Sequence, residues 1–237
     1  MTIEINPRKT LTFFLCIIVL LLIANIMGII HRILFNHDYL RGLFNLFDFN
    51  TEKNIPTLYS SITLIFASII LAFITYFRWK SQKTFFSWGV LSFIFLFLSI
   101  DEISSIHERL IAPTRRFFDT SAFFYYAWII PYGIALIIFV VSYIKFLLEV
   151  PKSIMMLFLL SGGLFVLGAI GFEMLGGWQA ELYGTKGLLY SIFYTCEELL
   201  EMLGVAVFIY TLLRYILNEN QLIEIILRNN VTIQLRK

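Results

Sequence analysis

Long apolar runs, separated by short polar segments, repeat along the whole chain. A helix needs about 20 mostly apolar residues to cross a bilayer. Six segments meet this requirement, at about residues 11–30, 58–77, 85–106, 123–144, 153–175 and 187–213. The pattern predicts an all-α fold, a polytopic membrane bundle of about six transmembrane helices. Residues 1–217 are expected to form this domain, and residues 218–237 a short cytoplasmic tail.

The composition agrees with a membrane protein and excludes several other classes. The 237 residues are 59% hydrophobic and 14% charged, whereas soluble domains carry about 25% charged residues. The mean hydropathy is +0.83. A soluble enzyme and a disordered chain are therefore excluded. The net charge is only +2 and the basic residues are scattered, so nucleic acid is not expected as a partner, and the lipid bilayer is.

The distribution of Lys and Arg predicts the orientation, because cytoplasmic loops of membrane proteins are enriched in them. With the N-terminus inside, inner segments carry 11 of these residues and outer segments carry 7. Both termini are thus predicted to be cytoplasmic, in a multi-pass protein of the cell's inner (plasma) membrane. The first apolar segment is longer than a signal-peptide core and no A-x-A site follows it, so it is expected to remain as a span.

Eight ionisable residues occur in or at the ends of the third, fifth and sixth segments. A charged side chain at the bilayer centre costs about 2.5–3.5 kcal/mol on insertion scales, and intramembrane ionisable residues usually mark a functional site. No Lys or Arg lies at the same depth inside a segment. Protonation, water or a bound cation must therefore offset the cost. The carboxylates expected to ligate a metal are Asp101, Glu102, Glu173, Glu197, Glu198 and Glu201.

Helical geometry brings most of these side chains together. At 100° per residue, five side chains of the sixth segment fall in one stripe about 100° wide; they are Tyr190, Tyr194, Glu197, Glu198 and Glu201. On the third segment Asp101, Ser105 and Glu108 share a face, and a regular helix turns His107 elsewhere. The residues of the third segment lie toward the outer surface, and Glu197 lies about 15 Å below the start of the sixth segment at 1.5 Å per residue. The sequence therefore predicts one site that opens outward, with Tyr190 and Tyr194 as binding residues.

Carboxylates with an imidazole suit Zn, Fe or Mn, and carboxylates alone suit Mg, Ca or Mn. A divalent metal (Zn, Fe, Mn or Mg) is therefore the expected cofactor, with His107 and Glu108 as catalytic ligand or base. The Glu-x-x-His spacing of di-iron bundles is absent, since Glu102 and His107 are five residues apart. The sequence also lacks H-E-x-x-H, G-x-S-x-G, Walker A and C-x-x-C motifs.

Three functions fit these residues. The first is a metal-dependent enzyme that acts on a lipid or other hydrophobic substrate near the outer leaflet. The second is a proton- or cation-coupled transporter, although the inner half of the spans lacks polar residues that would complete a path. The third is a sensory or structural membrane subunit whose acidic site binds a ligand. Whether the protein is an enzyme, and its oligomeric state, stay open at this level.

Two segments carry a family resemblance. The segment from Phe47 to Pro56 reads F-D-F-N-T-E-K-N-I-P, and Asp101-Glu102 is followed by His107-Glu108. These match the F-D-x-x-x-E-x-N-I-P and D-E-x4-H-E motifs of a family of uncharacterised bacterial multi-pass membrane proteins, which this chain resembles. The resemblance implies a bacterial membrane protein and carries no activity, substrate or cofactor. It draws attention to Glu52 as a binding residue at the rim of the site.

Overall fold

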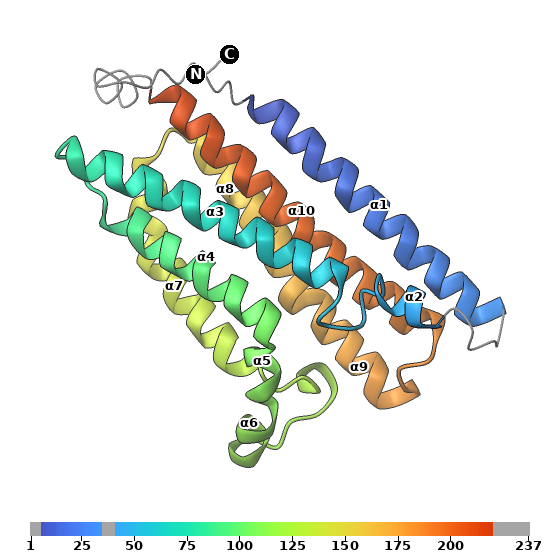
Figure 1. The fold of residues 1–237 in the computed structure, drawn as a ribbon. Helices are drawn as coiled ribbons and strands as arrows, with labels where there is room; N and C mark the ends of the chain where they lie inside the picture. Colours follow the sequence, from blue (N-terminus) through green and yellow to red (C-terminus); the bar gives the residue numbers. More distant parts are fainter. Residues whose placement is uncertain (1–5, 35–40, 220–237) are drawn as a thin grey trace.

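The computed structural model describes residues 6–34 and 41–219, and this part of the chain contains helices and no strand (Figure 1). The long helices are α1 (Pro7–Leu34), α3 (Ile55–Lys80), α4 (Phe86–Ser104), α7 (Ile129–Glu149), α8 (Lys152–Val166), α9 (Glu173–Tyr183) and α10 (Leu188–Asn218). A π-helical turn, η3 (Leu167–Phe172), joins α8 to α9. The short helices are α2 (Arg41–Asn45), α5 (Ile106–Arg109), α6 (Ile111–Phe117) and η2 (Ala122–Phe124).

Six helices in the described residues are long and apolar enough to cross a membrane, which confirms the predicted fold class. The boundaries differ in places. The third span ends at Ser104, the fourth begins at Ile129 instead of residue 123, and the fifth continues through η3 and α9 to Tyr183. Apart from residues 218 and 219, the predicted tail lies outside the described residues.

Capping side chains or prolines occur at the starts of several of these helices. Asn6 accepts hydrogen bonds from the backbone N–H groups of residues 8 and 9 at the start of α1. Asn54 caps α3 through a bond from Thr57 N–H, and Pro56 occupies the first turn, where a missing N–H is harmless. Because α7 begins at Ile129, Pro131 also lies in a first turn and does not interrupt the fourth span.

The helix α10 lies at the centre of the bundle and contacts α1, α3, α8, η3 and α9 (Figure 1). Glycines permit its closest approaches: a Cβ at Gly168 would lie 2.6 Å from the carbonyl oxygen of Glu197, and one at Gly204 would lie 2.8 Å from the Phe165 nitrogen. Small residues allow such packing between membrane helices.

Reciprocal serine pairs join α3 to α4. The hydroxyls of Ser61 and Ser99 lie 2.8 Å apart, and each contacts the other residue's carbonyl oxygen at 3.0 Å. Ser68 and Ser92 repeat this arrangement, donating to each other's carbonyls at 2.7 and 2.9 Å. The two helices therefore form a closely bonded antiparallel hairpin, which fixes the first turns of α3 relative to the last turns of α4.

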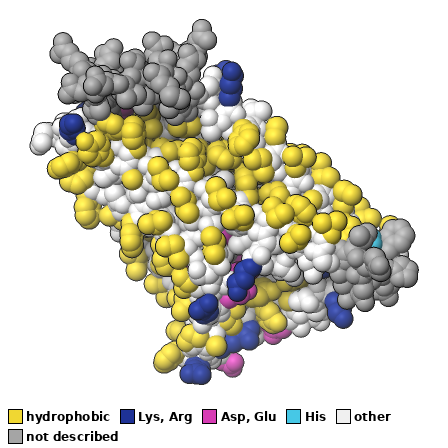
Figure 2. Space-filling view, in the orientation of Figure 1, with side chains coloured by type: hydrophobic (Ala, Val, Ile, Leu, Met, Phe, Trp, Pro, Cys, Tyr) yellow, Lys and Arg dark blue, Asp and Glu magenta, His cyan; other side chains and the backbone are white. Residues whose placement is uncertain are grey.

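The two ends of the bundle differ in chemistry. The terminal end, where α1 begins and α10 ends, holds an apolar core that includes Leu71, Trp88, Phe158 and Leu212. The opposite end, which we call the site end, carries α2, α5, α6 and the α9–α10 turn (Figure 1). On the face in Figure 2, hydrophobic side chains cover the middle of the bundle, and charged side chains gather near α5 and α6.

Candidate functional site

His107 lies between two carboxylates that come from different segments. Its Nδ1 is 3.3 Å from Asp101 Oδ1, and its Nε2 is 3.4 Å from Glu52 Oε1. The backbone N–H of His107 also donates to Asp101 Oδ1 at 2.8 Å. The imidazole is thus held by Asp101 at the end of α4 and faces the loop that precedes α3.

A break in the helix creates this contact and corrects the expectation that His107 points elsewhere. Ser105 ends α4 in the left-handed region, with φ 51° and ψ 47°, which is unusual for a residue other than glycine. The chain then starts α5 in a new direction, so His107 turns back onto Asp101. Glu108, which a regular helix places beside Asp101, is instead exposed.

Aromatic side chains surround the Asp101–His107 pair. The Tyr132 hydroxyl donates to Asp101 Oδ2 at 2.9 Å. The Trp128 ring lies edge-on to the His107 ring, with centroids 4.9 Å apart. Asp101 is 5% exposed. Its carboxylate therefore makes three hydrogen-bonding contacts while it is shielded from solvent. These contacts fix the orientation of the imidazole.

A second carboxyl pair lies deeper, between the fifth and sixth spans. Trp128 Nε1–H donates to Glu173 Oε1 at 3.1 Å, and the Glu173 and Glu197 carboxyls interact electrostatically. The π turn η3 ends just before Glu173, and π turns often occur at functional sites.

The other acidic side chains interact with both pairs. Glu198 interacts electrostatically with Glu173, Glu52 and His107, and Glu102 interacts with Glu198 and Glu52. Glu201, one turn further along α10, interacts with Glu198 and Glu102. All three are half-buried. The structure thus brings the acidic residues of the third, fifth and sixth spans within electrostatic reach of one another.

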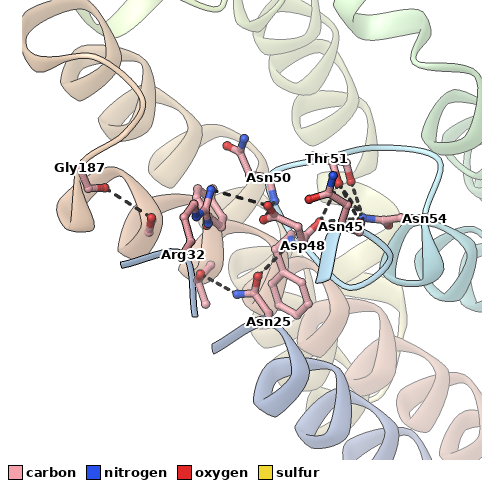
Figure 3. Close-up of polar contacts among 12 residues, drawn as sticks. Asn25, Arg32, Asn45, Asp48, Asn50, Thr51, Asn54 and Gly187 are labelled. Carbon is pink, nitrogen blue, oxygen red and sulfur yellow. Dashed lines mark hydrogen bonds and ion pairs between the residues drawn. The ribbon is translucent and has the colours of Figure 1, made fainter. Parts of the chain in front are cut away.

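The loop that carries Glu52 is fixed by polar contacts with α1, and α1 in turn is hydrogen-bonded to α10 (Figure 3). Asn25, 1% exposed within α1, accepts a bond from Phe49 N–H at 3.1 Å and donates to Thr195 at 2.9 Å. Arg32 lies 3.7 Å from Asp48. The Asn54 amide donates to the carbonyls of residues 48 and 51, both at 2.7 Å. Asp48, Glu52 and Asn54 of the F-D-x-x-x-E-x-N-I-P segment therefore have distinct structural contacts.

The two tyrosines predicted as binding residues have different surroundings. Tyr190 lies 2.9 Å from the Tyr126 hydroxyl and interacts with Glu173 and Glu197. Tyr194 accepts a bond from Arg32 at 2.7 Å. Tyr190 is therefore beside the acidic residues, and Tyr194 belongs to the contacts that anchor α1.

Several residues of the site could not be identified from the sequence. From the hydropathy pattern, Trp128 is expected only to be an aromatic residue near a membrane surface. No sequence pattern distinguishes Tyr132 from the other tyrosines. Arg32 and Asn25 lie on α1 and meet their partners only through tertiary packing. An asparagine inside an otherwise apolar span is the one available signal, because such a residue is costly unless it is hydrogen-bonded.

The arrangement of the described residues does not support the predicted metal site. Residues 6–34 and 41–219 contain no group of three or more His, Cys, Asp or Glu side chains that could hold a metal ion. The close contacts are instead between the His107 imidazole and the carboxyls of Asp101 and Glu52. Such contacts suit the binding and transfer of protons.

Burial and charge raise the pKa values of Glu52 and His107 above their ordinary values. Burial raises the pKa of Glu52 from 4.5 to about 7, with a further increase from the charge of Glu108, and these effects exceed the lowering by His107. Burial lowers the pKa of His107, but the hydrogen bond and charge of Asp101 and the charge of Glu52 outweigh it, so this pKa lies above 6.5. Glu52 can therefore exchange a proton close to pH 7, and the His107 imidazole holds its proton more strongly than a free imidazole does.

These pKa values predict that the protein is less stable at high pH. Between about pH 4.5 and 7 the folded chain binds more protons than the unfolded chain, so the free energy of unfolding falls as pH rises. The Glu52 shift corresponds to at most about 3 kcal/mol before solvent screening. Thermal unfolding in detergent from pH 5 to 8 should show a smaller decline for Glu52→Gln. Glu149→Gln, at an exposed position on α7, should keep the wild-type slope. An unchanged slope in Glu52→Gln would contradict the assignment.

A family model described as Domain of unknown function (DUF8692) matches residues 10–216 of the chain. The match covers all six spans except the ends of α1 and α10. No curated protein and no solved structure matches the chain.

Proposed function

Since the chain belongs to the DUF8692 family, whose description states no activity, we propose its function from the geometry of the site. The protein is a membrane enzyme that performs acid–base chemistry on a lipid or other hydrophobic substrate from one side of the bilayer. The observation that carries this proposal is the position of His107 between Asp101 and Glu52 at one end of the bundle.

The roles follow from the contacts of each group. An acid or base works best when its pKa lies near the operating pH, and Glu52, with a pKa of about 7, meets that condition. His107 Nε2 and Glu52 exchange a proton with the substrate or with water. Asp101 positions the imidazole and stabilises its protonated form. Glu173, which accepts a hydrogen bond from Trp128, and the neighbouring Glu197 serve as further groups that bind protons.

Transport is less well supported by the packing of the bundle. A proton or cation path would need polar groups through the terminal end, and the core there consists of side chains such as Leu71, Trp88 and Phe158. This packing supports a site that is reached from one side of the bundle, as an enzyme or a receptor requires. A sensory subunit shares this one-sided geometry, but it has no need of a group such as Glu52 that titrates near pH 7.

Lipid turnover by the reconstituted protein tests the proposal. Proteoliposomes made from a total bacterial lipid extract are incubated, and the lipids are analysed by mass spectrometry. We expect the wild type to convert at least one lipid with time, His107→Gln to lose the conversion, and Glu149→Gln at the opposite end of the bundle to retain it. Conversion that persists in His107→Gln, or no conversion by the wild type, would reject the proposal.

Elemental analysis of the same samples separates acid–base from metal chemistry. The acid–base proposal expects no stoichiometric Zn, Fe, Mn or Mg. If one or two metals per chain are present and are lost in a Glu197→Ala/Glu198→Ala variant, the reactive group is a metal-bound water. That result would replace the proton-transfer roles of His107 and Glu52 and restore the ligand assignment based on the sequence.

A further inference from the structure

A groove lies between α3 and α4 at the terminal end of the bundle, away from the acidic residues of the site end. Its volume is about 340 Å³, at the lower end of the range for small-molecule pockets. It is open to the surface that faces lipid in a membrane-spanning bundle. The lining residues come from the last turns of α3 and the first turns of α4: Ala72, Thr75, Tyr76, Trp79, Phe85, Gly89 and Ser92.

The groove offers apolar contacts and no free hydrogen-bonding group among its threonine and serine side chains. The Thr75 hydroxyl donates to the carbonyl of residue 71 at 2.7 Å, and the Ser92 hydroxyl donates to that of residue 68 at 2.9 Å. Both polar side chains are therefore satisfied within the protein. Gly89 leaves the floor open because it has no side chain. The occupant that matches this lining is a hydrocarbon chain.

A cation lies at the mouth of the groove. Lys80 Nζ is 5.8 Å from the ring centroid of Tyr76, one of the lining residues. In the described part of the chain Lys80 forms no ion pair, whereas the neighbouring Lys83 pairs with Glu219 at 2.8 Å. Arg78 is also occupied, by Thr84 and Tyr215. Lys80 is thus the exposed cation available to an anionic group at this position.

From these contacts we propose that the α3–α4 groove binds an anionic phospholipid, with an acyl chain along the groove and the headgroup phosphate on Lys80. The exposed Trp79 lies where indole rings commonly settle, at the level of lipid headgroups. Lipid tails already surround the bundle, so the hydrocarbon contact alone does not select one lipid. Selection comes from the charge of Lys80, and the groove fixes the position of the bound molecule.

Native mass spectrometry of the detergent-purified protein tests this site, with phosphatidylglycerol and phosphatidylethanolamine as probes. We expect saturable binding of one phosphatidylglycerol per chain and weaker binding of the zwitterionic lipid. Lys80→Gln should reduce the affinity for phosphatidylglycerol about fivefold, because one basic residue near anionic lipid contributes about 1 kcal/mol. Gly89→Leu, which fills the groove, should abolish saturable binding.

Two control variants make the test specific. Lys145→Gln removes an exposed cation from the same end of the bundle, and Gly163→Leu adds a side chain at a glycine with open space around it; both should bind as the wild type does. Equal loss in Lys80→Gln and Lys145→Gln would show diffuse charge attraction and overturn the site. Unchanged binding in Gly89→Leu, or a change only in its oligomeric state, would also overturn it. If Gly89→Leu does not fold, Lys80→Gln, on the surface, decides alone.

Discussion

Replacing Gly168 with alanine is expected to lower the stability of the bundle strongly. The added methyl group would lie 2.6 Å from the carbonyl oxygen of Glu197 and 3.1 Å from the nitrogen of Glu201. These are backbone atoms of α10, so no side-chain rotation relieves the overlap. Overpacking typically costs about 1–3 kcal/mol, which corresponds to a fall in Tm of about 5–10 °C at the upper end for a chain of this size.

Neighbouring glycines supply the matched control for this experiment. A Cβ at Gly162 or Gly163 meets no atom within 4 Å, and alanine is the better helix former by about 1 kcal/mol. Gly162→Ala and Gly163→Ala should therefore keep or raise the Tm in detergent, while Gly204→Ala should fall as Gly168→Ala does. If all four variants have the same Tm as the wild type, this result would contradict the close approach of the fifth span to α10.

Asp101→Asn is expected to reduce lipid conversion by about 10²–10⁴-fold, the usual contribution of acid–base catalysis. This expectation rests on the proposed function. The asparagine can still accept the His107 N–H bond, but it removes the charge that orients the imidazole and raises its pKa. The substitution should therefore act on the chemistry while the fold is retained, which thermal unfolding would verify.

The pH dependence of the residual activity distinguishes positioning from a structural defect. Without the Asp101 charge the pKa of His107 falls, so neutral imidazole exists at lower pH. The acid limb of the rate profile should move to lower pH in Asp101→Asn. Tyr132→Phe removes one bond to Asp101 but leaves its charge, so it should reduce the rate less and leave that limb in place. An Asp101→Asn profile that falls uniformly, without a shift, would contradict the positioning role.

The six spans could be predicted from the sequence because hydropathy is a local property that adds along the chain. The run from residue 58 to 77, for example, has enough apolar residues to form a span whatever its neighbours are, and it lies within α3. The acidic stripe of the sixth span was equally accessible, since Glu197, Glu198 and Glu201 belong to one uninterrupted helix. Local pattern also indicated the start of α3, where Asn54 precedes Pro56.

The contacts of the site depended on features that hydropathy does not encode. One left-handed residue at Ser105 turns His107 onto Asp101, and one π turn changes the direction that Glu173 faces. Because each residue of a helix rotates its side chain by about 100°, a single irregular residue redirects everything after it. The sequence by itself therefore determined which segments enter the membrane and which carry charge. Tertiary structure alone decided which of those charges meet, because packing sets where each helix breaks and how it is rotated.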